Sequence, residues 1–438
     1  MLTPLTLMAG AVLFYAVFSD RLAKTVVTAP IFFVGLGVLA GSVLGLVDLH
    51  SDDKILIQVL EAALVMVLFA DASGLDVRRW TRESSLSGRL LGIGLPLTML
   101  VGAVVAMVLL PGLQPWQAGL IGVILAPTDA ALGQAVVANP RVPAVVRNAL
   151  NVESGLNDGL ALPFVTILIA LGLLASGIDT ELKAVETIAL ALVGSTAIGL
   201  AAGFGGGLLM RIGAERGLAD ARWLPIAPVA LAIGTFGLAD EIGASGFIAV
   251  WVAGLVAGAM ARDHLPDAVL DLPEQFADVL AAIGFLLLGV GLLVPVLARA
   301  TTAAVAYAVL SLTVVRILPV AIAMLRTGFA PATLLYVGWF GPRGLASIVF
   351  AGLVLESGLP DASAVTDVVL LTVGFSLVAH GVTAAWGAGR YARWFERAAQ
   401  IDPGIPEAAE LSAPHHRRRA LRWPTVGAAK QAAESGEG

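Results

Sequence analysis

The sequence predicts an all-α membrane protein that crosses the bilayer about 13 times, and three observations support this fold class. Of the 438 residues, 58% are hydrophobic and only 13% are charged, against about 25% charged residues in a soluble domain. The mean hydropathy of +0.91 exceeds what a soluble monomer could bury. Finally, the apolar residues form runs of roughly 17–25, the length that crosses about 30 Å of hydrocarbon.

The composition also excludes several classes of protein. The chain has no Cys, which excludes a disulfide scaffold, a thiolate metal site and a cysteine nucleophile. The net charge of -6 argues against a nucleic-acid partner, so the lipid bilayer is the expected environment. The 49 Gly and 22 Pro are typical of closely packed, interrupted membrane helices.

The apolar runs define the predicted domain organisation. The expected spans are about 4–18, 25–47, 55–74, 90–110, 116–138, 144–174, 187–210, 223–239, 245–261, 276–297, 301–325, 333–355 and 365–389. The first run is interpreted as a retained span, because no basic segment precedes it and basic residues follow it directly. Residues 1–390 would then form the membrane domain, and residues 391–438, rich in Ala, Pro and Arg, a disordered cytoplasmic tail.

The basic residues predict the orientation of the chain. An odd number of spans puts the two termini on opposite sides of the membrane. With the tail in the cytoplasm, the inner loops carry 13 Lys and Arg residues and the outer loops carry 3. We therefore expect the N-terminus outside and the C-terminus in the cytoplasm of a cell membrane. Two basic residues, Arg316 and Arg343, fall inside predicted spans.

Two of the predicted spans are interrupted about ten residues from their start. The fifth contains Pro127, and the twelfth contains Gly341, Pro342 and Gly344. Proline removes a backbone donor and glycine loosens a helix, so both spans should unwind inside the membrane.

The two interruptions occupy corresponding places seven spans apart, which is typical of transporters built from inverted repeats. We expect two inverted six-helix repeats with crossed discontinuous helices. The repeats would cover about 1–174 and 223–390, with a linker helix at about 187–210.

Ionisable residues inside the spans are the candidates for a functional site. A charge at the bilayer centre costs about 2.5–3.5 kcal/mol on insertion scales, and such residues commonly mark ion or proton paths. Three acids, Asp129, Glu153 and Asp158, oppose the two bases Arg316 and Arg343. Their net charge of -1 is one that a single monovalent cation or a single proton would neutralise.

The spacing of the acids on the sixth span suggests a division of roles. Ser154 and Asp158 are four residues apart and form an oxygen-rich stripe, while Glu153 and Asn157 form the neighbouring stripe. Hard cations prefer oxygen ligands, and Thr128 with the freed carbonyls of the broken fifth span could complete a coordination shell. Glu153 is better interpreted as the partner of a membrane arginine.

Structural interpretations remain open for the same residues. Asp129 could cap a helix after Pro127, and Asp158 could cap a helix where a loop ends. Asp71 could mark only the interfacial end of the third span, and His380 is more readily explained as a packed histidine than as a proton carrier.

Taken together, these motifs resemble a known family. Ala-Pro-Thr-Asp at 126–129, Glu-Ser-Gly-Leu-Asn-Asp-Gly at 153–159 and Gly-Pro-Arg-Gly at 341–344 resemble the monovalent cation/proton antiporters of CPA1 type, which include bacterial NhaP and animal NHE exchangers. The resemblance runs from the first span to about residue 390. It implies an NhaA/NhaP-like fold, a homodimer, a moving core made of spans 4–6 and 11–13, and no enzymatic activity or cofactor.

The resemblance also implies roles for individual residues. Asp158 would bind the cation and the proton alternately, with Asp129, Thr128 and Ser154 lining the same Na+ site. Asn157 stands where electrogenic relatives carry a second Asp, which implies electroneutral exchange of one cation for one proton.

Further implied roles concern the support of the site. Glu153 would be bridged to Arg316, and Arg343 would support the crossed broken helices. Asp71 would match an acid of the third span that reaches the site. Pro342 departs from the family pattern, since animal members usually carry Leu there.

The expected function is therefore exchange of Na+, or of Li+ or K+, for H+ by alternating access, and the composition of the chain suggests a bacterial source. Two other functions stay open: a proton-coupled transporter of another solute class and a cation channel. An anion carrier should show unpaired membrane arginines, and a channel should show a repeated carbonyl filter or an acidic ring. An intramembrane hydrolase would need a nucleophile elbow or a zinc motif beside Ser154 and His380.

Overall fold

The fold was analysed in a computed structural model, which describes residues 4–22, 25, 27–47, 54–75, 85–129, 132, 139–262, 264–266 and 268–409. Within these ranges the secondary structure is helical throughout, with turns and short connections and no strand. The predicted all-α fold class is therefore confirmed.

The helices follow one another with short connections. In chain order they are α1 (Pro4–Leu22), α2 (Ala29–Val38), α3 (Lys54–Gly74), α5 (Ser85–Arg89), α6 (Leu95–Leu109), α7 (Pro115–Ile124), α9 (Ala144–Ala175), α10 (Glu181–Ala189), α11 (Ser195–Glu215), α12 (Ile226–Glu241), α13 (Gly246–Ala261), α14 (Ala268–Leu287), α15 (Leu293–Arg299), α16 (Thr302–Leu312), α17 (Val314–Ala323), α18 (Pro331–Trp339), α19 (Leu345–Glu356) and α20 (Ala362–Ile401). Short π-helical turns extend α2 and join α5 to α6, α10 to α11 and α14 to α15.

Seven continuous helical stretches within the described ranges are long and apolar enough to cross a membrane. They are Leu5–Leu22, Leu86–Leu109, Ala144–Ala175, Glu181–Glu215, Val269–Arg299, Thr302–Ala323 and Ala362–Ile401. Shorter apolar helices lie between them, among them the two that flank the predicted interruptions, Pro115–Ile124 and Leu345–Glu356. The chain is thus a multi-pass membrane protein, while the total of thirteen spans and the pairing of the two repeats stay predictions.

The sequence explains where several of these helices begin. Thr301 and Ser245 accept hydrogen bonds from backbone N–H groups in the first turns of α16 and α13, at 3.2 and 3.4 Å, as side-chain caps do. Pro115 and Pro331 occupy the first positions of α7 and α18, where a missing N–H is tolerated.

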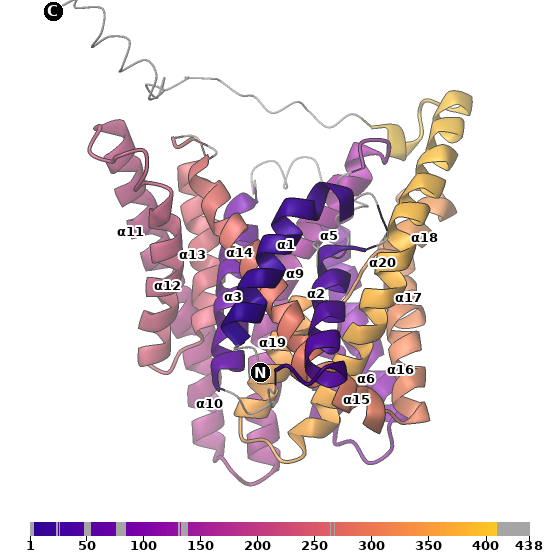
Figure 1. Cartoon of the computed structure of the whole chain (residues 1–438), viewed down its shortest axis with the longest axis horizontal. Helices are drawn as coiled ribbons and strands as arrows, with labels where there is room; N and C mark the ends of the chain where they lie inside the picture. The colour runs from indigo at the N-terminus through magenta and orange to yellow at the C-terminus, as the bar shows by residue number, and fades with distance from the viewer. Residues whose placement is uncertain are drawn as a thin grey trace, which may run out of the picture.

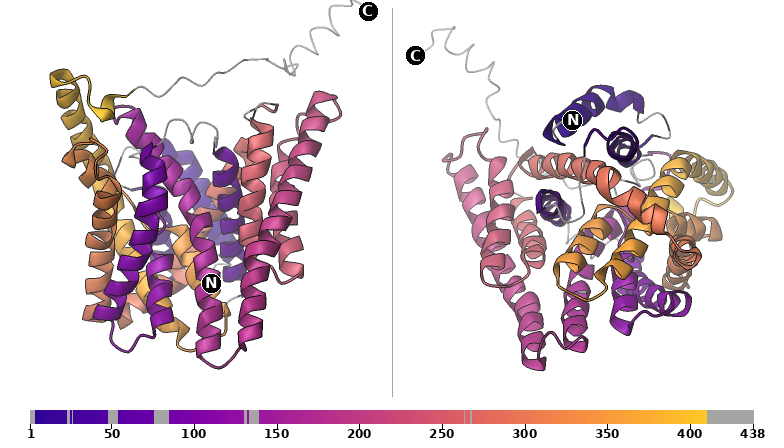
Figure 2. Two further views of the ribbon diagram at one scale, coloured as in Figure 1. Left: turned by 180° about the vertical axis from the view of Figure 1, so that it is seen from behind. Right: turned by 60° about the horizontal axis from the view of Figure 1, so that its bottom comes forward.

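The helices stand roughly side by side, as both side views show (Figures 1 and 2). The group α11, α12 and α13 lies at one side, and α16, α17, α18 and α20 lie at the other. Between the two groups, α3 packs on α13 and α14, and the short helix α19 contacts α3, α7 and α20. The halves α7 and α19 of the two interrupted spans therefore lie inside the bundle.

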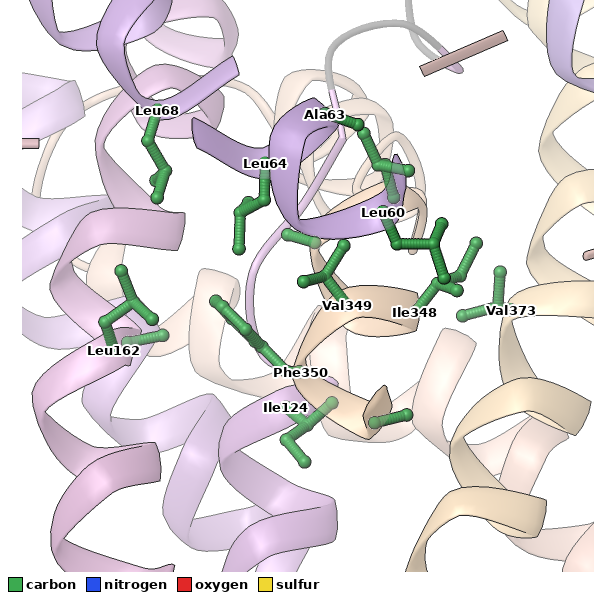
Figure 3. Packing of buried hydrophobic residues seen from close by; sticks show 14 of the residues in the cluster. Leu60, Ala63, Leu64, Leu68, Ile124, Leu162, Ile348, Val349, Phe350 and Val373 are labelled. Atoms are coloured by element: carbon green, nitrogen blue, oxygen red, sulfur yellow. The ribbon is translucent and has the colours of Figure 1, made fainter. Parts of the chain in front are cut away.

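An apolar cluster holds the short helices in the bundle centre. Leu60 and Leu64 of α3 point toward Val349 and Phe350 of α19, and Ile124 of α7 lies beneath them (Figure 3). All five are buried. Because close packing of apolar side chains fixes their relative positions, this cluster anchors the ends of α7 and α19 that border the interruptions.

The C-terminal boundary of the membrane domain differs from the prediction. Instead of ending near 390, α20 continues to Ile401, and residues 406–408 form a short 3-10 turn. Glu407 is only 2% exposed and accepts hydrogen bonds from the backbone N–H of Ala330 (2.9 Å) and the hydroxyl of Thr333 (2.5 Å). The expectation of disorder is thus wrong for residues 391–409: α20 continues to Ile401, and Glu407 caps the start of α18. Residues 410–438 lie outside the described ranges.

Replacing Glu407 by Ala should destabilise the protein by ~1–2 kcal/mol, because it removes the acceptor at the N-terminus of α18. The measurement is the thermal unfolding temperature of the detergent-solubilised chain. Glu396→Ala is the matched control: Glu396 pairs with Arg141 on the surface, with both side chains about half exposed, and such pairs contribute ~0–1 kcal/mol. Equal unfolding temperatures for the two variants would contradict this role of Glu407.

Candidate functional site

The two interrupted spans meet at their interruptions. After α7 ends at Ile124, the backbone N–H of Asp129 donates to the carbonyl of Pro342 at 2.8 Å. In return, the Asp129 carboxylate accepts the backbone N–H of Leu345, the first residue of α19, at 2.9 Å. Asp129 is therefore a helix cap, but for α19 of the other interrupted span rather than for a helix after Pro127.

Two glycines allow this close approach. A Cβ atom added at Gly344 would overlap the carboxyl group of Asp129, and one added at Gly341 would lie 3.0 Å from Cζ of Arg316 and from Cγ2 of Thr128. The break between α18 and α19 therefore needs glycine for space at both positions: a larger residue at either one would push the two spans apart.

Gly344→Ala should consequently disrupt the crossing, since the new methyl group and the Asp129 carboxylate cannot occupy the same volume. We expect a destabilisation of ~1–3 kcal/mol, measured by thermal unfolding. Gly352→Ala is the control on the same helix, because nothing lies within 4 Å of its added Cβ. An unchanged Gly344→Ala protein would refute the steric argument.

Arg343 joins the backbones of the two breaks. Its guanidinium donates to the carbonyls of Gly341 (2.8 Å) and Pro127 (3.4 Å), and its backbone N–H donates to the Ser376 hydroxyl at 2.7 Å. The side chain is fully buried. It thereby satisfies carbonyl groups that the interruptions leave without helical partners.

Glu153 on α9 forms an ion pair with Arg316 on α17. The two N–H···O contacts are 2.6 and 2.8 Å, in the bidentate geometry that favours arginine over lysine. Both side chains are 1% exposed. Of the two membrane arginines, Arg316 is thus the partner of Glu153, and the pair removes two charges from the expected cluster.

Thr128 links the broken span to α9. The Ser154 hydroxyl donates to the Thr128 carbonyl at 2.5 Å, and the Asn157 amide donates to the Thr128 hydroxyl at 2.8 Å. All three side chains are buried. The structure therefore brings these three predicted site residues together, and Asn157 supports Thr128 through its hydrogen bond.

Asp158 lies on α9 one helical turn after Ser154. It is 7% exposed, and its Oδ1 atom is buried without a hydrogen-bond partner within the described part of the chain. The acids that interact electrostatically with it are Asp71 and Asp129. Asp71 on α3 lies against Gly155 of α9: a Cβ atom at Gly155 would be in van der Waals contact with the Cβ of Asp71, at 3.6 Å.

The three acids thus converge while both membrane arginines are engaged elsewhere. Counting Asp71 with the five residues considered from the sequence changes the formal charge of the cluster from -1 to -2. Three carboxylates beside the Ser154 and Thr128 oxygens form a donor set suited to a hard monovalent cation or to protons.

Two supporting residues were not predicted from the sequence. The Ser347 hydroxyl donates to the carbonyl of Ile124 at 2.8 Å and so caps the end of α7. Ser376 receives the Arg343 N–H and also contacts His380 Nδ1 at 3.1 Å, while His380 Nε2 lies 2.9 Å from the Trp339 carbonyl. His380 is thus a packed histidine beside the break. The sequence could have indicated Ser347, because it places a hydroxyl in an apolar span three residues after Gly344.

Comparisons with known proteins agree with this geometry. The family model described as "Sodium/hydrogen exchanger, transmembrane" matches residues 8–388. The chain is 26% identical over 417 residues to the K(+)/H(+) antiporter NhaP of Alkalimonas amylolytica, covering 93% of this chain and 70% of that protein. It is 26% identical over 347 residues to the Na(+)/H(+) antiporter NhaS2 of Synechocystis sp., covering 75% of this chain and 61% of that protein.

A solved structure shows the same fold. The sodium proton antiporter MjNhaP1 from Methanocaldococcus jannaschii superposes with a TM-score of 0.71 at 20% identity, covering 89% of this chain and 98% of that one. Since the family model extends over most of the chain and the crossed interruptions lie within it, the chain belongs to the sodium/hydrogen exchanger family.

Proposed function

We propose that this protein is a secondary antiporter that exchanges a monovalent cation, Na+ first among the candidates, for H+ across the cell membrane. The observation that carries the proposal is the buried Asp158, whose Oδ1 has no hydrogen-bond partner among the described residues, at the place where Asp71 and Asp129 converge. The names of the relatives, one a K(+)/H(+) and one a Na(+)/H(+) antiporter, support the class of ion and leave the choice among Na+, K+ and Li+ to experiment.

The proposed ligands are oxygen atoms from two elements that cross. Asp158 and Ser154 come from α9, while Thr128 and Asp129 come from the broken span after α7. Asp71 adds a third carboxylate from α3. A ligand set shared between crossed elements changes its geometry when those elements move, which is what alternating access requires.

Competition for Asp158 would couple the two fluxes. The carboxylate holds either a proton or a cation, and either one neutralises its charge. A neutral site crosses the apolar barrier at much lower cost than an empty, charged one. A site without a bound ion therefore does not change sides of the membrane. As a result, the cation crosses only in exchange for the proton, and the proton only in exchange for the cation.

The remaining parts of the proposal concern assembly and orientation. We infer a homodimer in which the regions around the two interruptions move, with the N-terminus outside and the C-terminus in the cytoplasm. The alternative of an anion carrier loses support because Arg316 is paired with Glu153 and Arg343 donates to backbone carbonyls.

The test is dissipation of an imposed pH gradient in proteoliposomes after addition of NaCl, LiCl or KCl, with choline chloride and protein-free liposomes as controls. We expect a monovalent cation to dissipate the gradient at a rate that does not depend on an imposed membrane voltage, since Asn157 contributes no second titratable carboxylate on α9. A voltage-dependent rate would overturn the electroneutral stoichiometry. No response to any of the three cations would overturn cation exchange.

A further inference from the structure

A groove outside the candidate cation site lies between α18 and the C-terminal half of α20. Its volume is about 660 Å³. Its floor and walls are largely aromatic: Tyr336, Trp339, Phe340, Trp386 and Trp394 all line it. Several of these rings stack, with Tyr336 and Tyr391 at a centroid distance of 4.0 Å and Tyr391 and Trp394 at 5.3 Å. The groove is therefore a preformed apolar surface with a rigid base.

The length of α20 places this groove at the edge of the hydrocarbon layer. The helix has 40 residues, so that at about 1.5 Å per residue it is about twice as long as the ~30 Å hydrocarbon core. Part of the helix therefore extends beyond the hydrocarbon, and we infer from Arg390, Arg393 and Arg397 that this is its C-terminal part. Trp386 and Trp339 belong to the side chains that concentrate at such interfaces.

An exposed apolar stripe leads along α20 to three arginines. Val378, Val382 and Trp386 are spaced four residues apart and are 59%, 51% and 64% exposed. Arg390, one further turn along, has its guanidinium carbon 5.7 Å from the centre of the Trp386 ring. The stripe is long enough to lie against an acyl chain before it reaches a cationic end.

That cationic end is formed by Arg390, Arg393 and Arg397, which line the groove and are exposed. Within the part of the chain that the structure describes, none of the three forms an ion pair. The nearby carboxylate of Glu396 receives two hydrogen bonds from Arg141, at 2.8 and 3.0 Å, and that of Glu407 is buried at the start of α18. Arg393 interacts electrostatically with Glu396, but that carboxylate is already paired with Arg141, so the three arginines leave a net positive charge at the groove.

We propose that this groove binds a phospholipid with an anionic headgroup. The phosphate lies among the three arginines, whose planar N–H donors suit a phosphate, and an acyl chain lies along the aromatic floor and the Val378–Trp386 stripe. The charge of the three arginines selects an anionic headgroup. The apolar length of the groove requires a lipid rather than a soluble phosphate.

The groove also touches the broken span. Trp339 is the last residue of α18, and its indole N–H donates to Thr383 on α20 at 3.0 Å. Its carbonyl contacts His380, which in turn contacts the Ser376 that holds Arg343. A lipid in the groove therefore packs against the residues that connect α20 to the interruption, and its binding stabilises that connection.

The test is retention of lipid by the purified full-length chain, counted by native mass spectrometry during titration with phosphatidylglycerol or with phosphatidylcholine of the same acyl chains. We expect wild type to bind phosphatidylglycerol more tightly by about ten-fold or more, since basic residues near a membrane surface attract anionic lipid. The triple variant R390Q/R393Q/R397Q should lose this preference, and R390K/R393K/R397K should keep most of it. Unchanged preference in the Gln variant would overturn the proposal.

A matched control separates this site from general surface charge. Arg211 in the last turns of α11, and Arg216 and Arg222 in the connection to α12, lie at the same end of the molecule as the C-terminal end of α20 (Figure 1). Replacing these three arginines by Gln should leave the preference intact, and an equal loss would overturn the assignment.

Two further arms test the apolar part of the groove. Ala332→Trp fills it while the arginines stay, and should reduce retention of phosphatidylglycerol in a protein that still elutes as a single species. Soluble glycerol phosphate should not compete, and competition would overturn the requirement for a lipid. Because every readout is lipid retention, failure here is distinguishable from failure of the proposed ion exchange.

Discussion

Asp158→Asn is expected to reduce cation-dependent dissipation of a pH gradient to the level of protein-free liposomes while leaving the protein folded. The amide has nearly the same shape as the carboxylate but cannot exchange a proton for a cation. Since Asp158 is buried and its Oδ1 has no hydrogen-bond partner among the described residues, a neutral side chain costs less to bury there. We therefore expect an unfolding temperature at or above that of wild type, which separates loss of exchange from loss of fold.

The matched control for this experiment is Asp240→Asn. Asp240 lies near the end of α12 and is exposed, so its charge is solvated and no role in the site is assigned to it. This variant should exchange at the wild-type rate. Wild-type exchange by Asp158→Asn, measured in the same liposomes, would instead remove Asp158 from the proposed mechanism.

Breaking the Glu153–Arg316 ion pair should produce the largest loss of stability. Either Glu153→Ala or Arg316→Ala leaves one charge buried without its partner, at 1% side-chain exposure in the intact protein. Such a loss costs about 3–5 kcal/mol, far more than a surface pair. The measurement is thermal unfolding of the solubilised chain, together with the yield of protein that elutes as a single species.

The double replacement distinguishes a charge effect from a packing effect. In Glu153→Leu/Arg316→Met both charges are absent, so the penalty for an unpaired buried charge disappears. This variant should therefore be more stable than either single variant. A double variant that is less stable than both singles would show that packing, rather than the unpaired charge, dominates at this position.

Much of the architecture is predictable from local sequence because the bilayer imposes simple rules. Hydrocarbon tolerates only apolar runs of a certain length, so hydropathy locates the helices. A Pro or several glycines within such a run predict a break, and the structure has non-helical backbone at Pro127 and at 340–344. Hydropathy does not locate the end of α20, because its last turns carry Arg390, Arg393 and Arg397 and no longer form an apolar run.

By itself, then, the sequence determined the membrane class, the positions of the broken spans and the few ionisable residues that could form a site. Only the tertiary structure decided which of them meet: Arg316 rather than Arg343 pairs with Glu153 across 163 positions, Asp129 caps α19, and Asp71 joins Asp158. The physical reason is the distance along the chain between the residues that interact. Burial and helix length depend on neighbouring residues, whereas an ion pair or a cap depends on how distant segments cross.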